Sequence, residues 1–77
     1  MTGLELIKKI EEHDFMGLVV NGYAAVEIKE QAEELGIELS DAVANTIAVH
    51  YEKFGYGVNL SKEDNKKFLQ GLKEIQL

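Results

Sequence analysis

The side chains best suited to chemistry in this 77-residue chain are its fourteen carboxylates and two histidines, because it contains no cysteine. His13 and His50 are far apart in the sequence, and neither begins a metal-ligand spacing such as His-x-x-x-His. No Gly-x-Ser-x-Gly motif and no phosphate-binding glycine loop is present, and residues 64–67 lack the ligand pattern of a calcium loop. The sequence therefore predicts no catalytic, cofactor-binding or metal-binding residues, and we expect a protein that is not an enzyme.

Carboxylates instead gather in one short segment, residues 23–35. On a helix of 3.6 residues per turn, four glutamates of this segment occupy the side opposite its apolar residues, and Tyr23 and Val26 fall among them. An exposed tyrosine and a β-branched residue inside an acidic surface are typical of a protein interface, although the preceding loop could instead fold back over them. The candidate partner-binding residues are Tyr23, Val26, Glu27, Glu30, Glu33 and Glu34.

Four helices are expected to position these residues, and each has a start signal. Thr2 and Glu5 have the spacing of a capping box, which predicts a helix reaching about residue 13. A second helix is expected over about 23–35, with Gly36 as its left-handed end. Ser40 and Ser61 are good N-cap residues for a third and a fourth helix. The predicted inner faces are Leu6, Ile7 and Ile10; Ala25, Ile28, Ala32 and Leu35; Val43, Ala44, Ile47, Ala48, Tyr51 and Phe54; and Phe68, Leu69, Leu72 and Ile75.

The segment before the second helix allows two interpretations. Asn21-Gly22 between apolar residues is a hairpin signal, which would place a short hairpin or turn near 17–26. The residues that follow are better helix formers than strand formers. We therefore favour a short helical turn or loop over 14–20, with Asn21 capping the second helix.

The third helix is apolar nearly all round, since Ala42 and Val49 lie opposite its inner face. Such a helix is buried on more than one side. We expect it to be the central helix, covered on one side by residues 15–20 or by a second copy of the chain in a homodimer. Gly71 inside the fourth helix costs about 1 kcal/mol relative to alanine, so the end of that helix is expected to fray.

Residues 31–37 match the first half of a helix-turn-helix through Ala32, Leu35, Gly36 and Ile37. The second half departs from this pattern, because the turn is longer and the next helix begins with Ser40 and Asp41 rather than with cations. The chain has no arginine, and the leading helix is acidic. A helix-turn-helix-like pair is therefore expected, without direct binding of nucleic acid.

Net charge is confined to one half of the chain. Residues 1–39 hold nine acids and three lysines, whereas residues 40–77 hold five of each, and the total is −6. Such a field repels nucleic acid and attracts basic surfaces. No signal peptide and no apolar run long enough for a membrane is visible, so we expect a cytoplasmic protein without a membrane partner.

These features predict an all-α fold, with residues 1–77 forming one small bundle of about four helices. The expected function is that of a small acidic inhibitor or adaptor that binds a basic surface of a target protein. A nucleic-acid-processing enzyme is one candidate target, with the glutamates mimicking phosphates as viral and mobile-element proteins do. The alternatives are a helix-turn-helix-like transcription regulator and a self-associating structural subunit. No known family is recognised.

Overall fold

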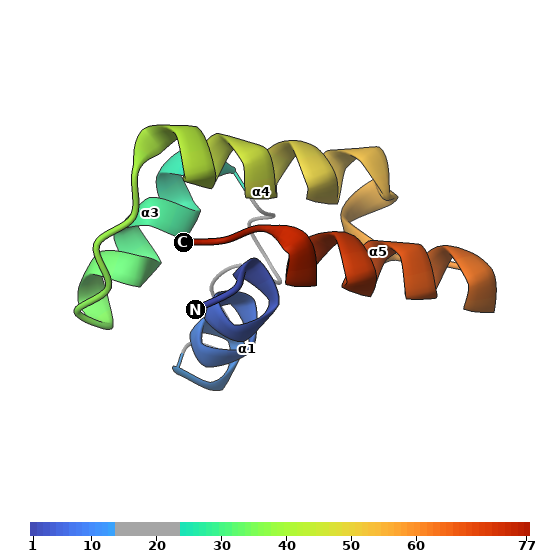
Figure 1. Cartoon of the computed structure of the whole chain (residues 1–77), viewed down its shortest axis with the longest axis horizontal. Helices are drawn as coiled ribbons and strands as arrows, with labels where there is room; N and C mark the ends of the chain where they lie inside the picture. Colours follow the sequence, from blue (N-terminus) through green and yellow to red (C-terminus); the bar gives the residue numbers. More distant parts are fainter. Residues whose placement is uncertain (14–23) are drawn as a thin grey trace.

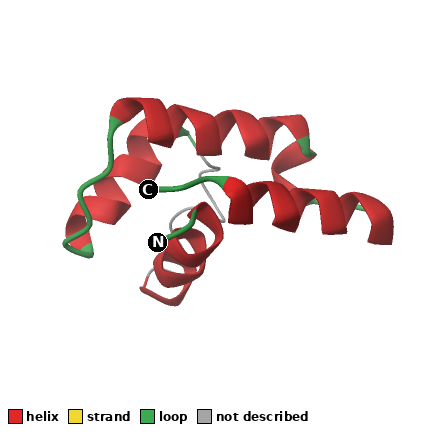
Figure 2. Cartoon of the chain, viewed as in Figure 1, coloured by secondary structure: helices red, strands yellow, loops and turns green. Residues whose placement is uncertain are grey.

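The computed structural model describes residues 1–13 and 24–77 of the chain. Over these residues it contains helices and no strand, apart from an isolated antiparallel bridge between Thr2 and Gln76 (Figures 1 and 2). None of the described helices is both long enough and apolar enough to cross a membrane. The predicted all-α fold is confirmed. The elements are α1 (Gly3–His13), α3 (Ala25–Glu34), α4 (Asp41–Lys53), the short 3-10 turn η1 (Gly55–Gly57) and α5 (Lys62–Glu74).

Three helices start at the predicted caps. The amide of Glu5 donates to the hydroxyl of Thr2 (3.3 Å), and the amide of Thr2 donates back to the carboxylate of Glu5 (3.3 Å). The Ser40 hydroxyl accepts from the amide of Val43 at 3.2 Å, and Ser61 does the same for Asp64 at 3.1 Å. Each bond satisfies an amide that has no partner inside its helix.

The start of α3 differs from the prediction. The helix begins at Ala25, and its N-cap residue is Ala24, not Asn21. Ala24 has no side chain that could accept a hydrogen bond, so this end of α3 lacks the stabilisation that the other helix starts have. Because residues 25 and 26 are helical, a hairpin that reaches residue 26 is wrong, and the rest of the predicted hairpin or turn lies outside the described residues.

The end of α3 follows the prediction. Gly36 has a φ of +74°, and its amide donates to the carbonyl of Glu33 while the amide of Ile37 donates to the carbonyl of Ala32. These two bonds form a Schellman motif, which needs a left-handed residue after the helix. The chain then turns through residues 37–40 into α4, which runs in a clearly different direction from α3 (Figure 1).

One core joins the four α-helices of the described residues. Helix α3 packs on α4, α4 packs on α5, and α1 packs on both α5 and α3. Tyr51 and Phe68 meet edge to face with ring centroids 4.9 Å apart, a favoured arrangement of aromatic rings. The buried residues are Leu6, Ile7, Ile10, Ile28, Ala32, Leu39, Ala44, Ile47, Tyr51, Phe68 and Leu72.

The outer side of α4 is open over the described residues. Ala42 is exposed, and Val49 keeps 61% of its surface accessible. Within one copy of the chain these two residues are therefore not buried, and their cover by a second copy stays a prediction. The residues expected to cover it, 15–20, lie outside the described part of the chain.

Helix α5 continues past Gly71 to Glu74, so the predicted fraying is not seen. The imidazole of His50 fills the space beside Gly71, and its Nε2 donates a hydrogen bond to the carbonyl of Phe68 at 2.8 Å. Of the predicted inner face of α5, Leu69 is 38% exposed, because it points away from the core that Phe68 and Leu72 enter.

The first and last residues of the chain lie side by side (Figure 1). The amide of Gly3 donates to the carbonyl of Ile75 at 2.8 Å, and the amide of Leu77 donates to the carbonyl of Met1 at 3.0 Å. These bonds connect the start of α1 to the end of α5 and supplement the packing between the two helices.

Candidate functional site

The predicted acidic face of α3 is divided among three different surroundings. Val26, Glu30 and Glu33 are all exposed, and their spacing of four and three residues places them along one outer line of the helix. We call these three residues the α3 stripe. Only two of the four glutamates therefore share a surface with Val26.

Glu27 turns away from the α3 stripe. Its side chain is half-buried, and the Oε2 atom is inaccessible to solvent and accepts no hydrogen bond from the described residues. With one carboxylate oxygen inaccessible, Glu27 exposes less of its charge than the residues of the α3 stripe do. Its part in partner binding stays a prediction.

Glu34 turns toward α1. Its Oε2 lies 3.8 Å from Nε2 of His13, at the end of α1. Both side chains remain about half exposed or more, so this contact contributes little to stability even when the histidine is protonated. Glu34 is accessible, but it lies on the side of α3 that faces α1 and not with the α3 stripe.

Of the two predicted apolar anchors, Tyr23 and Val26, the structure describes only one. Val26 keeps 62% of its surface accessible, so the described residues leave most of it open. Tyr23 lies outside the described residues. Val26 is thus the anchor candidate among the described residues, and the other two residues of the α3 stripe are carboxylates.

A groove opens between α3 and α4 next to Val26. Its volume is about 440 Å³, and small apolar side chains of Ala25 and Ala44 contribute to its lining. The polar part of the lining comes from one ion pair and one amide side chain. The groove-lining residues are Ala25, Val26, Lys29, Asp41, Ala44 and Asn45.

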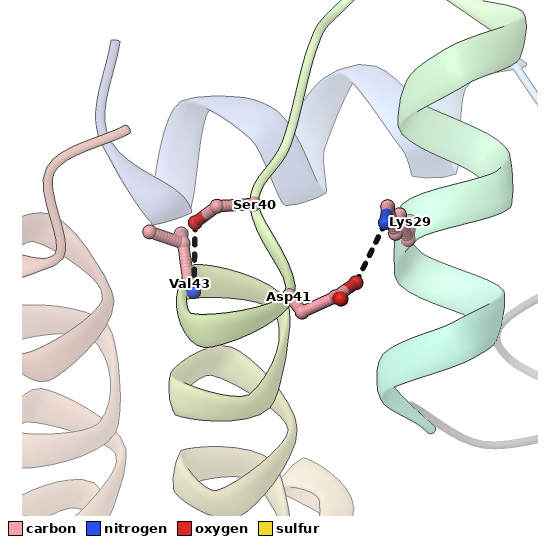
Figure 3. A network of polar contacts seen from close by, with 4 residues as sticks. All are labelled: Lys29, Ser40, Asp41 and Val43. Carbon is pink, nitrogen blue, oxygen red and sulfur yellow. Dashed lines mark hydrogen bonds and ion pairs between the residues drawn. The ribbon is translucent and has the colours of Figure 1, made fainter.

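Two of the groove-lining residues form an ion pair that joins α3 to α4 (Figure 3). The Nζ atom of Lys29 on α3 lies 2.6 Å from Oδ1 of Asp41, the first residue of α4. The hydrogen bond to Asp41 and its negative charge raise the pKa of Lys29 above its ordinary value of 10.5, against a small opposing effect of desolvation, and the charge of Glu33 acts in the same direction. Lys29 is therefore charged at neutral pH and forms its ion pair with Asp41.

The charges of the site follow from this pair. Lys29 and Asp41 neutralise each other inside the groove. Glu30 and Glu33 form no ion pair with any lysine of the described chain, so the α3 stripe keeps their negative charge. The site is a neutral groove beside an acidic stripe.

Local sequence patterns do not indicate the groove or its ion pair. Lys29 and Asp41 are twelve residues apart, and their meeting depends on how the turn after Gly36 directs α4. A spacing of three or four residues within one helix is the only separation at which a sequence pattern predicts such a pair. Periodicity, in contrast, places Val26 on the outer side of the second helix and leaves open whether the preceding loop covers it, and the structure shows it 62% exposed.

A second cavity of about 320 Å³ lies at the end of α1, against the turn that follows α3. It combines cationic Lys9 and anionic Glu12 with apolar Leu35 and Ile37, and therefore has no preference for one sign of ligand charge. Across residues 1–13 and 24–77, histidine and carboxylate side chains nowhere form a group of three or more that could hold a metal ion. The groove beside the α3 stripe is therefore the stronger candidate site.

No protein-family model, no curated protein and no solved structure matches this chain.

Proposed function

We propose that this chain is a non-enzymatic protein-binding module that presents the α3 stripe to a basic surface of another protein. The observation that supports this proposal is the position of Val26, 62% exposed and in line with Glu30 and Glu33. An apolar side chain left open to solvent gains free energy when a partner covers it. The neighbouring carboxylates orient a basic partner and speed its approach.

Within this proposal the module is a cytoplasmic inhibitor or adaptor. Enzymes that process nucleic acid are suitable targets, because they bind phosphates through clusters of lysine and arginine. Imitation of a phosphate row is not part of the proposal, because only Glu30 and Glu33 lie on the stripe while Glu27 and Glu34 face elsewhere. The stripe would bind as a small acidic patch with an apolar residue at one end.

Affinity capture from the cells that encode the protein tests this function. The wild type and a double variant, Glu30→Lys with Glu33→Lys, are immobilised separately, and captured proteins are identified by mass spectrometry. The control, Glu52→Lys with Glu74→Lys, has the same net charge but changes exposed residues of α4 and α5. We expect a basic partner on the wild type and the control and none on the stripe variant. Equal capture by all three proteins would contradict the proposal.

Self-association is the second candidate, because Val49 on the outer side of α4 is 61% exposed. Sedimentation equilibrium would show it as a mass that rises with concentration and that Val49→Lys returns to the monomer value. The transcription-regulator alternative is tested by fluorescence anisotropy with random duplex DNA at low salt. Binding that weakens as salt is added would favour that alternative over a protein partner.

A further inference from the structure

We infer that the partner presents a basic segment with an apolar side chain, and that this side chain enters the groove between α3 and α4. Lysine or arginine residues of the same segment then pair with Glu30 and Glu33. This inference rests on the proposed function and specifies the chemistry of the partner. It assigns the groove a role that is separate from the charge of the stripe.

The shape and lining of the groove suit one apolar side chain. Its volume of about 440 Å³ falls in the range of ligand pockets, about 300–1,000 Å³. Ala25 and Ala44 have short side chains and leave room at the groove, while Val26 forms one apolar wall. An aliphatic side chain of the partner would therefore remove apolar surface from water on both molecules.

The polar groups of the groove tolerate such a ligand. Lys29 and Asp41 already bind each other, so neither needs a counter-ion from the partner. The exposed amide of Asn45 can both donate and accept hydrogen bonds, which suits the backbone of a bound segment. An apolar group can therefore enter without leaving a charge of the groove unpaired.

Charge determines which segments can approach. Glu30 and Glu33 lie along the same outer line of α3 as Val26, which lines the groove. The whole chain carries a net charge of −6. A second copy meeting this surface through a twofold axis would place the two acidic stripes near each other. A basic segment has the opposite charge and meets no such repulsion, so we assign the groove to a basic partner.

Two synthetic peptides test the inference with the full chain. Both are lysine-rich and identical, except that one has a central leucine where the other has serine. Binding is followed by NMR of the isotope-labelled protein. We expect the leucine peptide to bind about tenfold more tightly, as burial of one such side chain implies, and to shift the amide signals of Ala25, Val26 and Asn45.

Two variants separate the groove from the acidic stripe. Asn45→Tyr places a large side chain at the groove and should remove the advantage of the leucine peptide while leaving the weaker binding of the serine peptide. Thr46→Tyr is the matched control, since Thr46 is also exposed on α4 but does not line the groove. Glu30→Lys with Glu33→Lys should weaken both peptides. Circular dichroism of each variant checks that the helices are retained.

The outcomes distinguish the inference from the function on which it rests. Equal binding of the two peptides, both weakened by the double glutamate variant, would overturn the groove inference and leave the acidic stripe as the binding surface. An unchanged leucine advantage in Asn45→Tyr would also overturn it. If neither peptide binds, the inference is wrong, and the capture experiment alone decides the proposed function.

Discussion

Gly71 lies in α5 directly beside the imidazole of His50. A Cβ atom added at this position would be 2.2 Å from Cε1 and 2.7 Å from Nε2 of the ring. The ring cannot move away without cost, because it stacks on Phe68 at 5.4 Å and donates to the carbonyl of that residue at 2.8 Å. The glycine therefore makes room for the histidine, and this offsets its poor helix propensity.

Replacing Gly71 with alanine should destabilise the protein, although the same change in an open helix stabilises by about 1 kcal/mol. We expect the free energy of unfolding to fall by about 1–3 kcal/mol, the usual cost of overpacking, as measured by urea denaturation. In a His50→Ala background the clash is absent, so Gly71→Ala should there be neutral or stabilising. An equal loss in both backgrounds would show that His50 is not the cause.

Single residues were predicted well where their own helix decides their surroundings. Periodicity within α3 placed Val26 on the outer side of the helix, where it is exposed, and Gly36 was assigned its left-handed role from its place after an apolar residue. The surroundings of Glu34 and Gly71 depend on other helices. A helical wheel counts positions around one axis and contains no information about those neighbours.

At the scale of elements, helix ends were likewise predicted well only where the residues that decide them are close together in the sequence. The starts of α1, α4 and α5 follow from side chains within three residues of each other, so a short pattern contains the whole interaction. The start of α3 at Ala25 has no such side chain, and the prediction placed it too early. The apolar content of the outer side of α4 indicated burial, but it does not show which element or second copy would cover that side.

The turn between α3 and α4 depends on the backbone of Gly36. Its φ of +74° disfavours any residue with a side chain, while a Cβ there would have no heavy atom within 4 Å. Gly36→Ala should therefore cost about 1 kcal/mol through backbone strain alone. Gly36→Asn should cost less, since asparagine tolerates this conformation better. Thermal unfolding compares the two, and an alanine variant as stable as the wild type would contradict the assignment.

Because of the ion pair between α3 and α4, we expect the folded protein to lose stability at alkaline pH. The pKa of Lys29 in the folded protein is raised above 10.5, so the contribution of its charge is fully present below that value and is lost as pH rises through the raised pKa. The measurement is the difference in unfolding free energy between the wild type and Asp41→Asn, because contributions common to both proteins cancel. Between neutral pH and about pH 10 this difference should be constant, and above that range it should shrink. A difference that does not change with pH would mean that the pair contributes nothing in solution.

At the scale of the whole molecule, the core is small and the two ends of the chain take part in closing it. Ile75 is half-buried against the core, and the segment around it bonds to the start of α1. A chain of this size has an unfolding free energy of only about 4–12 kcal/mol. Contacts made by a few residues at one end are therefore a large part of the total.

Deleting residues 75–77 should lower the free energy of unfolding by about 2–4 kcal/mol, because three backbone hydrogen bonds and the burial of Ile75 are lost. Calorimetry of the full chain and the shortened chain measures the difference. Ile75→Ala keeps the backbone bonds and should show only part of the loss. A deletion that leaves the melting temperature unchanged would mean that the paired ends are not held together in solution.

The bond from Leu77 to Met1 also has a topological consequence. A short peptide inserted between these residues would close the backbone into a ring without displacing α1 or α5. Such a ring could be cut at the exposed Gly36 or Glu38, giving a circular permutant that starts with α4 and ends with α3. The order in which the helices are synthesised would then differ while their packing stayed the same.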